Sequence, residues 1–198
     1  MRKFYPFFKR TFDVVISFIS LLFLIVPFLI IGLIIKMSSH GPIFFMQKRL
    51  GRNGKVFTIV KFRTMVVGAE EKGVYSNSND KRVTKFGKFL RNTSIDELPQ
   101  LFNVFIGNMS LIGPRPPLTY HPWSLENYTP YQLKMFNVRP GITGYAQVNG
   151  RRNLNWDERI ELNIWYSENY SFSLDVKIFF KTIIKVIKNE NNEDKIGK

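Results

Sequence analysis

Two adjacent carboxylates, Asp96 and Glu97 in the stretch SIDELPQL, are the residues of this chain that most clearly suggest chemistry. A carboxylate can attack phosphorus to form an acyl phosphate, and Mg²⁺ bound by carboxylate and phosphate oxygens can neutralise the repelling charge. Neighbouring positions on a helix point about 100° apart, so the pair does not match the facing carboxylates of a glycosidase. One nucleophile beside one metal-binding carboxylate fits better. The alternative is a helix cap, because Ser94 and Glu97 fit a capping box.

Basic residues that could hold phosphate groups lie in several short motifs. If Lys61 and Arg63 lie on a strand, they share one face, because alternate residues of a strand point the same way. Prolines on both sides of Arg115 restrict the backbone that carries its guanidinium. A solvated strand face is the alternative for the first two. The predicted phosphate-binding set is Lys61, Arg63, Arg91, Arg115 and Arg139.

The composition sets limits on the partners and on the chemistry. Among 198 residues, 29 Lys and Arg against 15 Asp and Glu give a net charge of +14. This excess indicates an anionic partner, which could be nucleic acid, a phosphate-bearing substrate or a lipid surface. Because the chain has no cysteine, disulfides, thiolate metal sites and thiol catalysis are excluded.

A long apolar segment near the N-terminus indicates that any site of this chain lies close to a membrane. Residues 14–35 contain no charge, and such a length is typical of a spanning helix. Pro27 divides the segment into parts of roughly 20 Å and 12 Å, both shorter than the roughly 30 Å hydrocarbon core. Basic residues flank the segment on both sides, and such flanks prefer the cytoplasm. A re-entrant helix satisfies both features, and a spanning helix kinked at proline is an equal alternative from this segment alone.

The remaining elements predict an α+β fold in which a small, mostly helical catalytic domain follows the membrane helix. We expect a membrane helix in residues 1–36, a catalytic domain at the cytosolic face in residues 37–188, and a disordered polar tail in residues 189–198. Residues 43–49 and 55–65 alternate as a β-hairpin would. Helices are expected at 83–91, 157–170 and 173–188, with irregular backbone in 111–153. The last helix is amphipathic and basic, so it suits an anionic interface or packs on the core.

Four blocks of sequence resemble one known family, the bacterial sugar transferases, specifically the small monotopic phosphoglycosyl transferases. They are KRTFDVVISFISLLFLIVPFLIIGLIIKM, GPIFFMQKRLGRNGKVFTIVKFRTM, SIDELPQLFNVFIGNMSLIGPRPPL and RPGITGYAQVNGR. The resemblance runs from about residue 9 to about residue 188. It implies a re-entrant helix broken at Pro27 and interfacial amphipathic helices. In relatives a serine often precedes this proline, whereas here the residue is Val26.

The resemblance also implies an activity. An enzyme of this family transfers a sugar 1-phosphate from a UDP-sugar to undecaprenyl phosphate and releases UMP, as the first membrane step of glycoconjugate synthesis. Asp96 would form a covalent phosphosugar intermediate in a ping-pong mechanism, and Glu97 would help to bind Mg²⁺. The expected location is the cytoplasmic face of the bacterial plasma membrane, inserted in one leaflet among phospholipids and without nucleic acid.

Two other classes of function compete with this one. A membrane-anchored nucleic-acid-binding protein would explain the basic charge, and it would bind oligonucleotides in a strongly salt-dependent manner. A structural protein of the membrane surface would use its basic residues on lipid and Asp96 only in a cap. Neither explains the ordered blocks of sequence. The sugar, the pathway and the oligomeric state are not specified by the residues.

Overall fold

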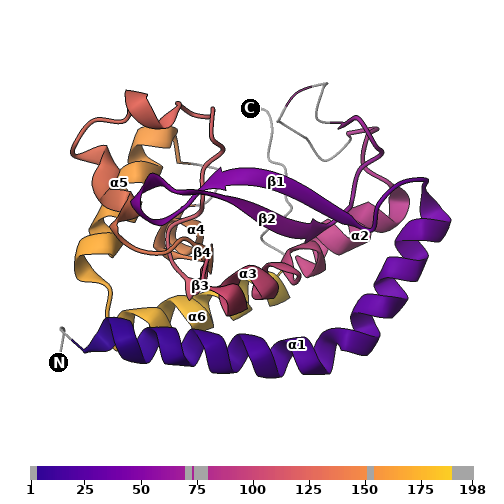
Figure 1. The fold of residues 1–198 in the computed structure, drawn as a ribbon, viewed down its shortest axis with the longest axis horizontal. Coiled ribbons are helices and arrows are strands. Elements are labelled where there is room, and N and C mark those ends of the chain that lie inside the picture. The colour runs from indigo at the N-terminus through magenta and orange to yellow at the C-terminus, as the bar shows by residue number, and fades with distance from the viewer. Residues whose placement is uncertain (1–3, 70–72, 74–79, 151–153, 189–198) are drawn as a thin grey trace.

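The computed structural model describes residues 4–69, 73, 80–150 and 154–188. Helices and short strands are mixed in one chain (Figure 1), which confirms the predicted α+β class. The predicted disordered tail, residues 189–198, lies outside the described residues.

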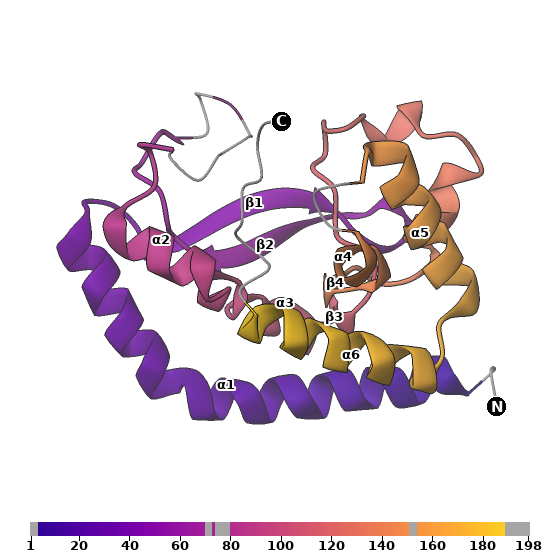
Figure 2. The same ribbon diagram turned by 180° about the vertical axis from the view of Figure 1, so that it is seen from behind.

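The apolar segment forms most of α1, Tyr5–Ser38. Pro27 lies inside this helix, and Figures 1 and 2 show α1 running along the lower side of the molecule and bending towards its C-terminal end. Proline removes one intrahelical hydrogen bond and crowds the preceding turn, which bends a helix without necessarily ending it. Among the described helices, only α1 is long and apolar enough to cross a membrane. The re-entrant path remains a prediction.

The predicted hairpin is confirmed. Strands β1, Phe44–Leu50, and β2, Val56–Phe62, pair antiparallel, with Met46 opposite Val60. The turn contains Asn53 and Gly54 at positive φ values of 56° and 71°. Asn and Gly tolerate this left-handed backbone best, so LGRNG closes the hairpin.

Short elements follow the hairpin and build the middle of the molecule. Helix α2 spans Lys85–Asn92, a 3₁₀ turn spans Ile95–Glu97, and α3 spans Gln100–Ile106. Strands β3, Ser110–Ile112, and β4, Gly141–Thr143, form a parallel pair. Between and after them lie two 3₁₀ helices, Leu125–Asn127 and Gln132–Asn137, and α4, Tyr145–Asn149. This confirms the short, irregular backbone expected after residue 111.

Two longer helices complete the fold. Helix α5 spans Trp156–Asn169 and begins with a capping box formed by Asn155 and Glu158. Helix α6 spans Phe172–Ile187, with Ser171 as its N-cap. The sequence predicted both within one residue at each end.

The core consists of several small clusters between these elements. Ile59 of β2 packs with Val104 and Met109 at α3. A second cluster joins Leu50 and Phe136 to Ile160 of α5. Burying these side chains fixes the hairpin, α3 and α5 relative to one another, and the candidate site lies where these elements meet.

Candidate active site

The acidic pair lies on a tight turn between α2 and α3. Ser94 has a left-handed backbone, with φ of 58°, and its side chain makes no capping hydrogen bond. The alternative of a capping box at Ser94 is therefore not what the structure has. Pro99 explains the difference, because its missing N–H and its ring are tolerated at the start of α3 but not within a helix that begins at Ile95. Asp96 and Glu97 thus belong to a separate turn and do not act as a cap for α3.

Lysine and arginine side chains from distant segments converge on this turn. Lys61 Nζ of β2 lies 2.6 Å from Glu97 Oε1. Arg115, in the loop after β3, places a guanidinium nitrogen 3.4 Å from the same oxygen. Arg91 of α2 donates from Nε to Thr64 Oγ1 at 2.8 Å and acts on the charge of Asp96. The structure therefore brings together five of the predicted site residues.

Close packing of α2 on the end of the hairpin makes this convergence possible. A Cβ atom at Gly87 would lie 2.1 Å from the Thr64 carbonyl oxygen, so only glycine allows the approach. The Thr84 amide donates to the same oxygen at 3.0 Å, and the Thr84 hydroxyl caps α2 by accepting from the Gly87 amide. Arg91 is thereby held one helix length beyond Thr84, within reach of Asp96.

The two carboxyl groups have opposite electrostatic environments. Burial raises the pKa of Asp96 to about 6, with a further increase from Glu97, against the opposing effects of Lys61, Arg91 and Arg115. Burial also acts to raise the pKa of Glu97, but Lys61 and Arg115 outweigh it and lower that pKa to about 2. At neutral pH Glu97 is a paired anion, whereas Asp96 is ionised but poorly stabilised. A carboxylate of this second kind is the better nucleophile.

Arg63 and Arg139, also predicted to bind phosphate, lie in other contacts. Arg63 is only 6% exposed, and its guanidinium donates to the carbonyls of Ser39 and His40 where α1 ends. Arg139 Nε donates to the Gly107 carbonyl at 2.9 Å, just after α3. The structure gives both arginines a role at helix ends, and it does not bring them into the cluster around Glu97. Phosphate binding by either remains an untested prediction.

Asn103 is a positioning residue that the sequence reasoning missed. It is 1% exposed, its Oδ1 accepts from the Val60 amide at 3.0 Å, and its Nδ2 donates to the Thr58 carbonyl at 2.7 Å. One side chain thereby ties α3 to the backbone of β2, which carries Lys61. The available signal was a polar amide within the apolar run LFNVFI, where a buried amide needs partners.

The donor set of the turn can be tested against the predicted Mg²⁺. Among the described residues no group of three or more His, Cys, Asp or Glu gathers into a metal cage. Mg²⁺ commonly binds through one or two carboxylates, with substrate phosphates and water completing the octahedron. Asp96 and Glu97 fit that mode and do not fit a site built from protein ligands alone.

Comparison with known proteins identifies the family of this chain. The family model of the bacterial sugar transferases matches residues 4–189, and the chain belongs to this family. An uncharacterized sugar transferase, EpsL of Bacillus subtilis (strain 168), is 43% identical over 182 residues, which are 92% of this chain and 88% of that protein.

Two longer relatives have names that state a reaction. The UDP-glucose:undecaprenyl-phosphate glucose-1-phosphate transferase of Klebsiella pneumoniae is 40% identical over 190 residues, 93% of this chain and 41% of that protein. The UDP-N-acetylgalactosamine-undecaprenyl-phosphate N-acetylgalactosaminephosphotransferase of Aeromonas hydrophila is 39% identical over 187 residues, 92% of this chain and 44% of that protein. The chain therefore spans about two fifths of the length of these relatives.

Proposed function

We propose that this chain transfers a sugar 1-phosphate from a UDP-sugar to undecaprenyl phosphate and releases UMP. The observation that carries the proposal is the Asp96 carboxylate, raised in pKa to about 6 and surrounded by cationic side chains on the turn that follows α2. The relatives named for this reaction support the substrate class. Their names differ in the sugar, so the sugar is left open.

The proposed chemistry has two balanced steps at one phosphorus atom. An oxygen of Asp96 attacks the β-phosphorus of the donor, and the bond from that phosphorus to the bridging oxygen breaks, so UMP leaves with the electron pair. An oxygen of undecaprenyl phosphate then attacks the same phosphorus and displaces the Asp96 carboxylate. Lys61, Arg91 and Arg115 stabilise the negative charge on the phosphate oxygens during both steps.

Mg²⁺ fits this proposal through the acidic pair. The contacts of Glu97 with Lys61 and Arg115 both use Oε1, so we propose that the other carboxylate oxygen of Glu97 would hold the ion. Bound there, the ion would neutralise charge on the donor's diphosphate. Lys61 holds Glu97 ionised and oriented, and this keeps a ligand ready at neutral pH.

The ping-pong order can be tested by intact-protein mass spectrometry of the detergent-solubilised chain. A panel of UDP-sugars is added with Mg²⁺ but without lipid acceptor. One of them should release UMP and add the mass of its sugar phosphate to wild type but not to Asp96→Asn, and undecaprenyl phosphate should remove the added mass. Glu168→Gln, at an exposed ion pair, is the control that should behave as wild type. UMP release only when the lipid acceptor is present would contradict the covalent order.

We propose that α1 lies in one leaflet at the cytoplasmic face of the plasma membrane and does not span it. The support is that both ends of α1 are tied to the same catalytic unit. Near its start, Lys9 Nζ lies 2.6 Å from Asp175 of α6, and at its end Arg63 binds the carbonyls of Ser39 and His40. In between, Asp13 Oδ1 accepts from the Leu111 amide. A spanning helix would carry its ends to opposite faces of the roughly 30 Å core.

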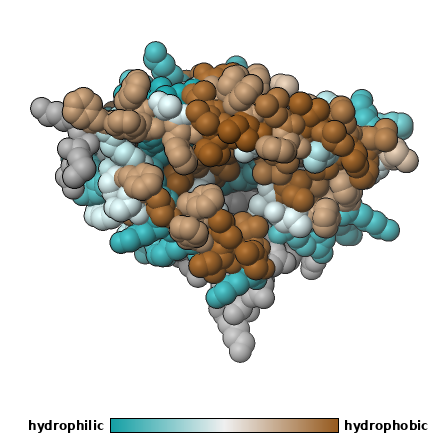
Figure 3. Space-filling view, turned by 90° about the horizontal axis from the view of Figure 1, so that it is seen from below, coloured by the Kyte–Doolittle hydropathy of each residue, from teal (hydrophilic) through white to brown (hydrophobic). Residues whose placement is uncertain are grey.

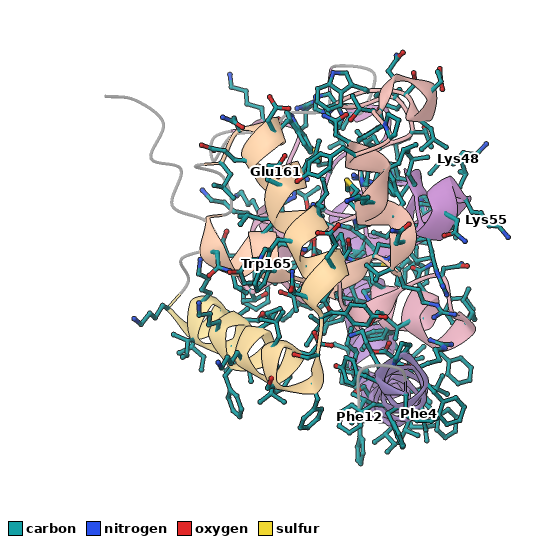
Figure 4. All side chains as sticks on the ribbon, turned by 90° about the vertical axis from the view of Figure 1, so that its left-hand side faces the viewer. Phe4, Phe12, Lys48, Lys55, Glu161 and Trp165 are labelled. Atoms are coloured by element: carbon teal, nitrogen blue, oxygen red, sulfur yellow. The ribbon has the colours of Figure 1, made fainter. Side chains whose placement is uncertain are left out.

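Exposed apolar side chains gather on the side of the molecule where α1 and α6 lie (Figure 3). They include Phe23, 80% exposed, on α1 and Ile187, 77% exposed, on α6. In Figure 4, Phe4 and Phe12 lie at the lower edge with α1, whereas Lys48 and Lys55 project from the hairpin on another side. Exposed surface of this kind marks a membrane or protein contact, and we propose phospholipid as the partner.

Because the chain has no cysteine, single-cysteine variants can test this placement. Lys3→Cys, just before α1, and Ser38→Cys, at its end, mark the two ends of the helix. In inverted membrane vesicles a membrane-impermeant maleimide should label both positions, whereas in intact spheroplasts it should label neither. Labelling of one position from each side would show a spanning helix.

A further inference from the structure

We propose that a cavity next to Arg115 binds the pyrimidine ring of the donor nucleotide and that Asn163 selects uracil. This inference rests on the proposed function and adds the specificity residues to it. The cavity measures about 40 Å³. We call it the arginine pocket; its walls include Arg49, Arg115, Tyr128, Trp156, Arg159 and Asn163.

The walls come from several parts of the fold. Arg49 belongs to β1, and Arg115 to the loop after β3. Trp156, Arg159 and Asn163 stand at positions i, i+3 and i+7 of α5, so they lie on one face of that helix. In Figure 4, Glu161 and Trp165 lie on the side of α5 that faces the viewer.

The position of Arg115 links the arginine pocket to the reacting centre. Arg115 lines the cavity, and one of its guanidinium nitrogens lies 3.4 Å from Glu97 Oε1. A nucleotide whose base occupies the cavity would pass its phosphates along Arg115 towards Asp96. This is the order in which base, phosphates and sugar follow one another in a nucleotide sugar.

Asn163 provides an independent indication of a ligand. It is 2% exposed, and its Oδ1 accepts no hydrogen bond from the part of the chain that the structure describes. A buried acceptor of this kind is costly unless a ligand or water donates to it. Uracil presents an N–H flanked by two carbonyls, so an amide can accept from that N–H and donate to a neighbouring oxygen.

The size and the chemistry of the cavity favour a pyrimidine ring over a purine or a simple phosphate ion. The volume has room for roughly three water molecules, which is closer to one six-membered ring than to a purine. Arg159 lies over the Trp156 ring, with its guanidinium carbon 4.7 Å from the ring centre, and such a cation–aromatic pair forms a flat wall. A simple phosphate ion would use the arginines but not this wall or the Asn163 acceptor.

The experiment measures binding of UMP, CMP, AMP and inorganic phosphate to the full chain in detergent, separately from transferase activity. For wild type we expect UMP to bind at least about tenfold more tightly than the other three. Asn163→Asp, which removes the amide donor, should weaken UMP about tenfold or more and reduce or reverse the preference over CMP. Asn169→Asp, on the same helix but outside the pocket, is the matched control and should leave both affinities unchanged.

A second variant guards against misfolding at the buried position. Arg159→Lys keeps the charge but loses the planar group over Trp156, and it should weaken UMP and CMP alike. If wild type turns over a UDP-sugar but both variants bind UMP as wild type does, the pocket assignment is wrong while the transferase proposal stands. Equal affinity for phosphate and UMP would also overturn the assignment. If wild type neither binds UMP nor turns over any donor, both proposals fail.

Discussion

Neutralising the two neighbouring carboxylates one at a time should change the stability of the protein in opposite directions. The pKa of Asp96 rises from 3.8 to about 6 on folding, mainly through burial. The pKa of Glu97 falls from 4.5 to about 2, against the effect of burial, because Lys61 and Arg115 stabilise its charge. At pH 7 the ionised Asp96 therefore destabilises the folded state, and the ionised Glu97 stabilises it.

The magnitudes follow from these pKa differences, at 1.36 kcal/mol for each tenfold change in acidity. At pH 7, Asp96→Asn should increase the free energy of unfolding by about 3 kcal/mol, and Glu97→Gln should lower it by about 3 kcal/mol. For a chain of this length these changes correspond to melting temperatures about 6–12 °C above and below wild type.

The pH dependence gives each change its own signature. A carboxyl group whose pKa is raised on folding costs no stability at pH values below its unfolded-state pKa. The full cost applies only at pH values above its folded-state pKa. The stability advantage of Asp96→Asn should therefore shrink to below about 1 kcal/mol at pH 4. A depressed pKa contributes stability that is lost only as pH falls from about 4.5 to 2, so the defect of Glu97→Gln should persist at pH 4.

The assay is thermal unfolding in one detergent, followed by tryptophan fluorescence at pH 7 and pH 4. Glu168→Gln is the control, because Glu168 lies in an exposed ion pair with Lys134 and such pairs contribute little. A melting temperature of Asp96→Asn at or below that of wild type at pH 7, or an equal increase at both pH values, would refute the electrostatic reasoning.

Three further outcomes follow from the structure. Asn103→Leu leaves two backbone groups of β2 unpaired and should lower the free energy of unfolding by about 2–5 kcal/mol; an unchanged melting temperature would show that α3 is held by packing alone. Asp175→Asn breaks the ion pair with Lys9, so it should cost roughly 3–5 kcal/mol and speed amide exchange at the start of α1, whereas uniform exchange would argue against a local tether. Single-turnover UMP release should rise with pH through about 6 and then level off, because only ionised Asp96 attacks; a rate that falls over this range would assign another role to Asp96.

Local sequence patterns were enough to predict the hairpin and α6, but not to decide whether Ser94 caps a helix. The alternation in FFMQKRL and VFTIVKF and the turn residues Asn53 and Gly54 predict the hairpin that the structure has. The apolar spacing of α6 likewise predicts that helix, because both depend on neighbours within a few residues. The capping box at Ser94, the alternative to a catalytic pair, is absent although it fits the same local rule, because Pro99 moves the helix start beyond it. The proline five residues later already indicates from the sequence that the helix boundary lies beyond Ile95.

The arginines show where sequence reasoning reaches a physical limit. Arg63, Arg115 and Arg139 all lie in motifs with proline, or close to a strand end, and all were predicted to bind phosphate. A helix C-terminus presents carbonyl oxygens with partial negative charge, and a phosphate presents anionic oxygens, so one planar guanidinium suits both. Residue type and spacing cannot separate these two kinds of acceptor; only the tertiary fold decides which one a given arginine meets.

That same ambiguity suggests how the site is built. Arg63 binds the end of α1 and Arg139 binds the carbonyl that follows α3, so these two guanidinium groups hold helix ends and leave the acidic turn to other basic residues. Lys61 and Arg115 act on Glu97. Both also act against the raised pKa of Asp96, but only Glu97 receives their hydrogen bonds. The asymmetry between the two adjacent carboxylates thus arises because burial outweighs the nearby cations at Asp96, whereas the ion pairs outweigh burial at Glu97.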